Sequence, residues 1–236
     1  MTTNNDDYDK AFTAMMDPMM AAVKDALTEE EMTRFGELND EAKASFPHPG
    51  LKVGTKAPDF TLPNVLGSTV TLSDELKEGP VILIFYRGSW CPVCNMHLKA
   101  FNALGSTYKE KYNAQIIAIT PQLTEVAKKL VEDAELNFKV CNDMDDTVIK
   151  AYGLHFILNS ELAEIYKKFN MQVSDDAGGR LSLPVPATFI IDRQGTIRAT
   201  QADAVYANRM KPAEVTKGLE LVKKDTTGAE CGCVVS

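Results

Sequence analysis

The chain has 236 residues, 44% of them hydrophobic, and a formal net charge of −8. That length and composition suffice for one substantial core with an appended segment. The acidic balance argues against a nucleic-acid partner, because such a surface repels phosphate groups. No apolar run reaches the roughly 18 residues that a membrane helix needs, and the polar start MTTNNDDYDK lacks the pattern of a secretory signal. We therefore expect a cytoplasmic protein, a setting in which structural disulfides are rare.

Residues 1–50 have the pattern of a helical extension. An apolar stripe recurs there at spacings of about three and four; its members are Tyr8, Phe12, Met15, Met16, Met19, Met20, Val23 and Leu27. Asp17-Pro18 is typical of a helix start, and Thr28 with Glu31 has the spacing of a capping box. The stripe favours packing against a core or an interface over a ligand role, and a homodimer stays open.

Residues 51–224 alternate strand-like and helix-like patterns, which predicts an α/β domain. Continuous apolar runs typical of buried strands are followed by a turn and an antiparallel return strand. The strands are expected at 81–86, 116–119, 188–191 and 196–198, and the helices at about 92–112, 122–135, 145–152, 160–169 and 211–223. Residues 225–236 are polar and then cysteine-containing, and we expect them to form a flexible tail.

The motif Trp90-Cys91-Pro92-Val93-Cys94 links the strand at 81–86 to the helix that follows. The first turn of a helix presents free N–H groups and a positive dipole end, which stabilise a thiolate. Pro92 fits the first helical position, so Cys91 is the expected N-cap, its sulfur placed to accept from a backbone N–H of the first turn. The spacing of three brings both sulfurs within reach of a disulfide.

The cysteine pair has two alternative interpretations, a metal site and an inert buried pair. A zinc site needs two more ligands, and His97 supplies at most one nearby. Two buried, inert cysteines are a further alternative. The strand–CxxC–helix context favours redox chemistry without a metal or another cofactor. His97 is either a helper of the thiolate or, as we expect, an ordinary surface residue.

Three segments now reveal a resemblance. FYRGSWCPVC at 85–94 resembles the active-site segment of the peroxiredoxin-like branch of the alkyl hydroperoxide reductase/thiol-specific antioxidant family. VGTKAPDFTL at 53–62 resembles the family's opening hairpin, and LPVPATFIID at 183–192 resembles its proline-led strand. The resemblance covers about residues 50–224. It implies a thioredoxin-like fold, with a central mixed sheet flanked by helices, and peroxide or disulfide chemistry.

The active-site segment departs from the family pattern P-x-x-x-T-x-x-C. The family's proline falls on Arg87, its threonine on Cys91 and its peroxidatic cysteine on Cys94. A distant family arginine that helps to bind peroxide falls on Pro186, which instead matches the cis-proline of thioredoxins. The site resembles a thioredoxin-like W-C-x-x-C centre in a peroxiredoxin frame, so fast peroxide reduction is not expected. Arg87 is a candidate for the missing positive charge; its alternative role is a surface salt bridge.

The attacking cysteine stays open at this point. The alignment nominates Cys94, whereas the helix start and the thioredoxin pattern nominate Cys91, which we expect to be the more exposed sulfur. Cys91 is favoured for disulfide exchange, and turnover needs both cysteines, one attacking and one resolving. Trp90 is expected to shield the pair and shape the partner surface, with ordinary core packing as the alternative.

Three cysteines lie outside the motif. Cys141 follows a short strand-like stretch and is expected to be a buried small hydrophobe. Cys233-Val-Val-Ser has the C-a-a-X form of a farnesylation site, and Cys231 is a candidate second lipidation site. Part of the protein would then be membrane-associated. A shuttle dithiol at Cys231 and Cys233, or no role for either, are the alternatives.

The combined prediction is a thiol-dependent antioxidant oxidoreductase that reduces peroxides through Cys91 and Cys94. The resemblance implies re-reduction by thioredoxin- or glutathione-type donors. A protein disulfide reductase and a redox-sensing adaptor without turnover are the alternatives. Repeated turnover distinguishes an enzyme from an adaptor, because a sensor is oxidised only once.

Overall fold

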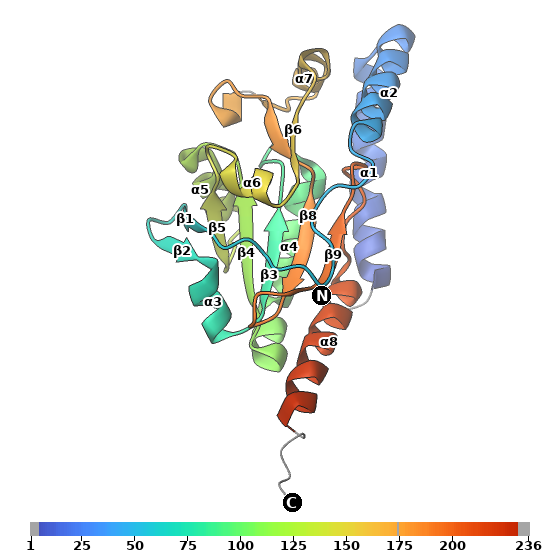
Figure 1. The fold of residues 1–236 in the computed structure, drawn as a ribbon. Coiled ribbons are helices and arrows are strands. Elements are labelled where there is room, and N and C mark those ends of the chain that lie inside the picture. Colours follow the sequence, from blue (N-terminus) through green and yellow to red (C-terminus); the bar gives the residue numbers. More distant parts are fainter. Residues whose placement is uncertain (1–4, 174, 231–236) are drawn as a thin grey trace, which may run out of the picture.

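The computed structural model describes residues 5–173 and 175–230. A five-stranded mixed sheet, ordered β5-β4-β3-β8-β9, forms its centre (Figure 1). Its strands are β3 (Val81–Phe85), β4 (Gln115–Thr120), β5 (Lys139–Asn142), β8 (Ala187–Ile191) and β9 (Ile197–Ala202). Strands β3, β4 and β5 run parallel, whereas β8 is antiparallel to both β3 and β9. This sheet confirms the expected α/β fold and the antiparallel return strand.

Helices and a small hairpin cover the two faces of this sheet, so its central strands are apolar on both sides. All five residues of β3 are fully buried, as its uninterrupted apolar sequence requires. One face packs against α4 (Pro92–Tyr112), α5 (Thr124–Asp133) and α8 (Pro212–Glu230). The other packs against β1 (Thr61–Pro63), β2 (Thr69–Thr71), α3 (Leu72–Glu78) and α6 (Thr147–Ala151).

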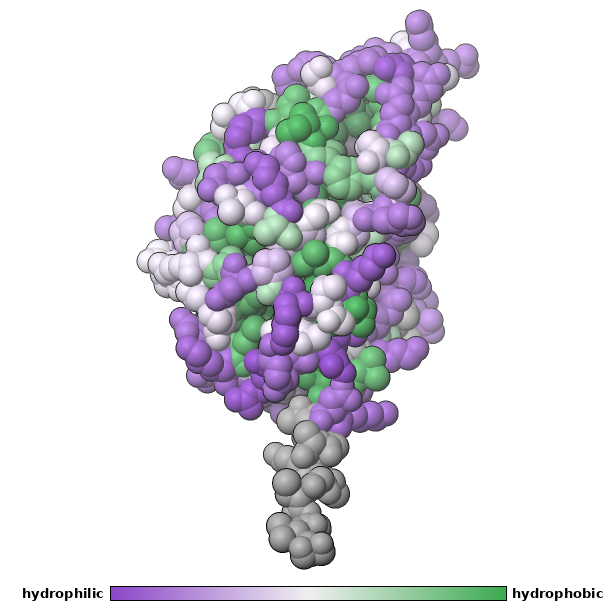
Figure 2. Space-filling model, viewed as in Figure 1, coloured by the Kyte–Doolittle hydropathy of each residue, from purple (hydrophilic) through white to green (hydrophobic). Residues whose placement is uncertain are grey.

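A third apolar cluster joins the N-terminal helices to a side layer of the domain. The side layer comprises β6 (His155–Ile157), α7 (Ser160–Lys167) and β7 (Ser182–Pro184), with β6 and β7 antiparallel. Helices α1 (Asn5–Ala26) and α2 (Glu29–Ala44) form what we call the α1–α2 hairpin. In Figure 1 it stands beside the β9 edge of the sheet, and Figure 2 shows hydrophobic residues between its upper part and the side layer. Val23, Leu27 and Leu38 supply its buried contacts there.

The two predicted helix-start signals in the extension had different outcomes. The capping box is confirmed, because Thr28 accepts from the backbone N–H of Glu31 and the Glu31 carboxylate accepts from that of Thr28. The start at Asp17-Pro18 is wrong, since Pro18 lies inside α1. The missing proline N–H leaves the carbonyl group of Ala14 free, and Ala14 is exposed, so water can satisfy it.

Helix α8 runs to Glu230, seven residues past its predicted end. An ion pair between Arg198 of β9 and Asp225 supports this extension, so residues 225–230 are helical where a flexible tail was expected. The candidate lipidation sites Cys231 and Cys233 lie outside the described residues. Among the described helices, none has the length and apolarity to span a membrane.

Candidate active site

The cysteine motif occupies the connection from β3 to α4, as the sequence predicts. Cys91 is the N-cap of α4 and Pro92 its first residue. The Cys91 N–H donates to the carbonyl of Gly88, and the Cys91 carbonyl accepts from Asn95, both at 3.1 Å. The Cys91 side chain accepts no capping hydrogen bond, which corrects the expectation that its sulfur faces the free N–H groups. Its thiol points to the second cysteine instead.

Both cysteines are reduced and buried, with 2% of Cys91 and none of Cys94 exposed. Cys91 is the more exposed of the two residues, as expected, but the difference is small. Cys91 nevertheless lines a small internal cavity of about 20 Å³, and Cys94 is not among the residues that line it. Access thus distinguishes the two sulfurs even though solvent reaches neither freely.

Cys94 holds the negative charge of the pair. Burial raises the pKa of its thiol, but four groups together outweigh burial and bring that pKa well below its usual range. These are the thiol of Cys91, which donates a hydrogen bond, the positive charges of Arg209 and Arg87, and the backbone N–H of Arg87. A thiolate hydrogen-bonded and paired with cations remains charged even when buried.

Cys91 has the opposite character. The hydrogen bond that its thiol donates to Cys94 raises its pKa most, and burial and the negative charge of Cys94 raise it further. The pair therefore carries one proton and one negative charge. That state is the reduced form of a dithiol in which one sulfur can pass its proton to the other.

Arg209 is the functional residue that sequence reasoning missed. It lies between β9 and α8, where its buried Nη2 is 3.3 Å from the Cys94 sulfur. Its Nε donates to the carbonyl of Tyr206 at 2.7 Å, which fixes the guanidinium plane. No motif marks Arg209, and 115 residues separate it from Cys94. Only the return of the chain along β9 brings it to the site.

Arg87 is buried, so its alternative role as a surface salt bridge is wrong. Its guanidinium lies between three aromatic rings, 4.7 Å from the centre of Trp90, 5.4 Å from Tyr166 and 5.1 Å from Tyr206. Its Nη2 donates to the Tyr166 hydroxyl at 3.2 Å, and its Nε has no partner in the described structure. Cation–π contacts of this kind hold a desolvated charge in place, here close enough to affect both sulfurs.

Trp90 is half-buried and lines the cavity at Cys91. Its ring lies 5.9 Å from that of Tyr166. Gly88 permits this position, since a Cβ there would come within 2.5 Å of the indole Nε1. Gln122 fixes the same loop by accepting from the Ser89 N–H at 2.7 Å. Trp90 thus shields the cysteine pair while remaining part of the surface.

Pro186 does not reproduce the thioredoxin feature that the alignment suggested. It is buried between β7 and β8, but the described chain contains no cis peptide bond. It lines a cavity of about 260 Å³ that Arg87 and Tyr206 also line. Pro186 therefore shapes the approach to the site.

His97 is a buried residue, which corrects its assignment to the surface. Its Nε2 contacts the carbonyl of Met210 at 3.0 Å. Burial and the charge of Arg209 lower the pKa of this imidazole to about 3, although the Met210 carbonyl opposes the shift. The ring is therefore neutral at pH 7 and donates this bond. Tyr8 of α1 packs edge-on against it, with the ring centres 6.4 Å apart.

Cys141 behaves as the sequence predicts. It is fully buried on β5, and burial raises the pKa of its thiol to about 12. It belongs to the apolar cluster on the sheet face opposite Cys91 and Cys94. Within the described residues, no three His, Cys, Asp or Glu side chains gather where a metal ion could bind.

Comparisons with known proteins point to the same chemistry. A family model described as the AhpC/TSA family matches residues 53–200. The chain is 28% identical over 148 residues to the thiol-disulfide oxidoreductase ResA of Bacillus thuringiensis, an alignment that covers 62% of this chain and 68% of that protein. It is 31% identical over 150 residues to a protein of Helicobacter pylori named as peroxiredoxin bcp, with coverages of 62% and 85%.

The fold agrees with these relationships. The crystal structure of peroxidoxin BcpB from Mycobacterium tuberculosis matches with a TM-score of 0.57 and 22% sequence identity, covering 75% of this chain and 98% of that one. The likeness confirms a thioredoxin-like peroxiredoxin fold. Since the family model spans more than half of its residues, this chain belongs to the AhpC/TSA family and is a thiol-dependent oxidoreductase.

Proposed function

We propose that this enzyme reduces peroxides through Cys91 and Cys94, with Cys91 attacking and Cys94 resolving. One observation carries the assignment: Cys91 lines the cavity, whereas the thiolate to which it donates its hydrogen bond belongs to Cys94. An oxidant in the cavity meets the Cys91 sulfur first. Cys94 serves initially as the acceptor of the Cys91 proton.

The oxidative half-reaction balances on these two residues. As the Cys91 sulfur attacks one peroxide oxygen, its proton moves to Cys94 and the O–O bond breaks. The departing alkoxide or hydroxide takes that proton and leaves as alcohol or water, and Cys91 is left as a sulfenic acid. The Cys94 thiolate then attacks the Cys91 sulfur, which forms the disulfide and releases hydroxide. Two electrons leave the pair, and one negative charge is present before and after.

The two buried arginines support this chemistry electrostatically. Two guanidinium groups act on a pair that carries one negative charge, and the described structure shows no carboxylate hydrogen-bonded to either. The surplus positive charge favours the oxygen that becomes negative as the O–O bond breaks. Arg209 and Arg87 thus provide positive charge at a site where this chain has Pro186 in place of the family's distant arginine. With both guanidinium groups beside the pair, peroxide reduction need not be slow for lack of positive charge.

Re-reduction needs an external dithiol or two thiols, and thioredoxin- or glutathione-type donors are the proposed source. A steady-state assay with hydrogen peroxide and a panel of these donors tests the function. We expect many equivalents of peroxide to be consumed per enzyme. Consumption of a single equivalent would instead indicate the redox-sensing adaptor.

Trapping of sulfenic acid tests the assignment of the two cysteines. In Cys94→Ser the resolving thiol is gone and the arginine charges act on Cys91 alone. Peroxide should therefore produce a sulfenic acid at Cys91, which dimedone captures when the oxidised protein is unfolded in its presence. Cys91→Ser should yield little adduct, since Cys94 does not line the cavity. An adduct at Cys94 and none at Cys91 would reverse the two roles while leaving peroxide reduction intact.

Protein disulfide reduction is the second candidate function. The CxxC pair at a helix start favours it, and so does the similarity to ResA. In this reaction Cys91 attacks the substrate disulfide and Cys94 releases the mixed disulfide. An insulin-reduction assay run beside the peroxide assay compares the two activities. A higher rate with insulin than with peroxide would make disulfide exchange the main function.

A further inference from the structure

The wall of the cavity at Cys91 includes residues from outside the sheet domain. The α1–α2 hairpin contributes Met19, Met20, Val23 and Phe35, which face Trp90, Pro92, Tyr166 and Tyr206 across the cavity. Its volume of about 20 Å³ has room for about one water molecule. Hydrogen peroxide, with two oxygen atoms, needs little more than this space, whereas a cysteine side chain carried on a peptide needs far more. The two half-reactions therefore place different demands on the same opening.

A larger cavity of about 260 Å³ lies directly outside the small one. Residues that line both are Met20, Phe35, Arg87, Tyr166 and Tyr206. Met20 and Phe35 belong to the hairpin, whereas the other three belong to the sheet domain and its side layer. Displacement of the hairpin would merge both cavities into one groove floored by Arg87. That groove leads to the Cys91 sulfur.

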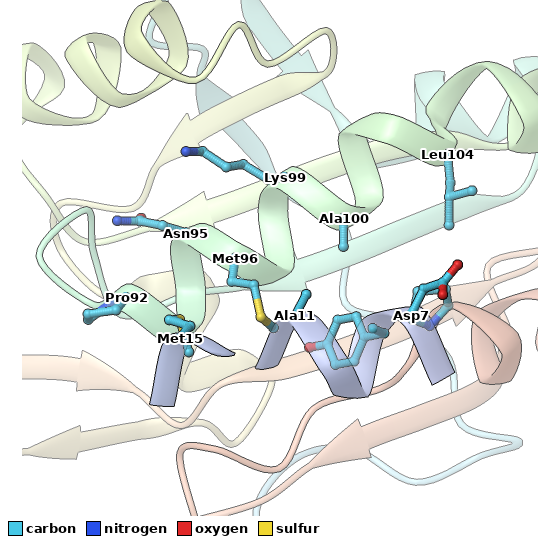
Figure 3. Close-up of a pocket in the computed structure, with 11 residues that line it drawn as sticks. Asp7, Ala11, Met15, Pro92, Asn95, Met96, Lys99, Ala100 and Leu104 are labelled. Atoms are coloured by element: carbon cyan, nitrogen blue, oxygen red, sulfur yellow. The ribbon is translucent and has the colours of Figure 1, made fainter. Parts of the chain in front are cut away.

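The hairpin is the wall that is easiest to move. Four of its side chains are buried: Tyr8, Val23, Leu27 and Leu38. A cavity of about 600 Å³ opens between part of α1 and α4, with Ala11 and Met15 opposite Met96 in Figure 3. Other α1 side chains, such as Phe12 and Met16, are only partly buried against the core. Interfaces this incompletely packed lose much of their dispersion energy. The opposite wall, formed by β3 and the start of α4, belongs to the core and cannot move independently.

Surface ion pairs complete the attachment of the hairpin. Arg34 pairs with Glu161 of α7 at 2.9 Å, Lys168 with Glu31, and Lys211 with Asp9. These side chains are about one-third to one-half exposed, and such pairs contribute only modestly to stability. The chain after the hairpin is fixed at Gly50, whose N–H donates to Gly153 and where a Cβ would meet Ala202 at 2.9 Å. Phe46 packs edge-on against Phe156 of β6, so residues 47–49, between Phe46 and Gly50, are placed to act as a hinge.

We propose that the α1–α2 hairpin is a size filter over Cys91: closed, it admits small peroxides, and it must swing away before a protein reductant reaches the disulfide. The inference rests on the proposed peroxidase function. In the reductive step a reductant thiolate attacks the Cys91 sulfur, and Cys94 leaves as a thiolate. A second reductant thiol then releases Cys91 as a thiol and becomes part of the reductant's own disulfide.

Charge reversal at Arg34 tests the filter without touching the redox pair. Arg34→Glu replaces attraction to Glu161 and to two glutamates of α2 with repulsion and favours the open hairpin. Glu161→Arg added to it restores the pair across the interface. Single-turnover oxidation by hydrogen peroxide is followed by the fluorescence of Trp90, the single tryptophan of the chain. Reduction by thioredoxin is measured separately, by acid quenching and alkylation of the thiols that are released.

We expect Arg34→Glu to accelerate reduction by thioredoxin about three- to tenfold, as loss of a few weak ion pairs predicts, and to change the peroxide step less than twofold. The double variant should return to the wild-type rate. Equal changes in both steps, or no change in the reductive step, would overturn the filter.

If Arg34→Glu unfolds, Phe35→Ala provides a second test, since widening the cavity should accelerate oxidation by cumene hydroperoxide more than by hydrogen peroxide. Absence of any oxidation by peroxide in the wild type would instead refute the proposed function itself.

Discussion

Cys94 and Cys141 lie on opposite faces of the central sheet, and neither side chain is exposed. On the Cys94 face, a neighbouring thiol and two buried guanidinium groups lower the thiol pKa. On the Cys141 face, burial raises the thiol pKa to about 12, and nearby Lys139 and Glu75 act in opposite directions. Equal burial is thus accompanied by a thiol pKa well below its usual range on one face and well above it on the other. What decides the outcome is the uncompensated positive charge.

The largest expected difference concerns the cysteines themselves. Cys91→Ser and Cys94→Ser should each abolish peroxide turnover, because no intramolecular disulfide can form. Cys141→Ser should retain at least roughly half of the activity, since its thiol lies outside the electropositive site. Steady-state peroxide consumption compares the three variants. A Cys141→Ser enzyme as inactive as the other two would mean that the faces are not chemically distinct.

Removal of Arg209 should have the next largest effect. Arg209→Met deletes a charge 3.3 Å from the Cys94 sulfur, so the pKa of Cys94 rises. The acid limb of the pH–rate profile should move to higher pH, and the peroxide step at neutral pH should slow by about 10- to 100-fold. Arg209→Lys keeps the charge and should restore part of the rate. An unchanged pH profile in Arg209→Met would show that Cys94 needs no help from this cation.

Part of the site around Cys91 and Cys94 could be predicted from the sequence, because the features that define it are local. A strand, a CxxC pair and a proline at the first helical position lie within a short segment, so Cys91 as N-cap and the extent of α4 follow from neighbouring residues. Helix α3 and strands β6 and β7 were not predicted. The strands are three residues long and α3 has seven residues, which is too short for a periodic pattern to emerge.

The charges around the pair could not be predicted in the same way. Nothing in the sequence marked Arg209. His97 was expected at the surface and Arg87 had a surface salt bridge as its alternative role, because charged and polar side chains are usually exposed. Their burial depends on contacts with distant segments: Met210 for His97 and Tyr166 for Arg87. In the N-terminal helices the same difference holds. The capping box at Thr28 is local and predicted the start of α2. The apolar stripe of α1 did not indicate that the α1–α2 hairpin lines the cavity at Cys91.

His97 sharpens the comparison between the two faces. The positive charge of Arg209, which favours the Cys94 thiolate, also disfavours protonation of the His97 imidazole. Its pKa is about 3 in the folded protein, below the ordinary value of 6.5. A lowered pKa means that the unfolded chain binds more protons between these values. The stability that neutral His97 provides is therefore complete above pH 6.5 and is lost progressively as the pH falls toward 3.

Urea unfolding between pH 4 and 7 checks this sign. As the pH is lowered, the free energy of unfolding should decrease more steeply for the wild type than for His97→Gln, which cannot take up the proton. The difference in slope should reach up to about 1.4 kcal/mol per pH unit. Arg209→Met should reduce the difference by removing one cause of the shift. Parallel curves for the wild type and His97→Gln would mean that the imidazole titrates normally.

Lys139 on the opposite face gives the smallest expected effect and the matched control for Arg209. Its ammonium group forms an ion pair with Glu75, so the positive charge near Cys141 is already balanced. Lys139→Met should raise the pKa of Cys141 further and slow its already slow alkylation by iodoacetamide. Peroxide turnover should stay within about twofold of the wild type, although the unpaired Glu75 should lower the melting temperature. If Lys139→Met reduced turnover as much as Arg209→Met, charge on either face would reach the redox pair, and the contrast between the two faces would fail.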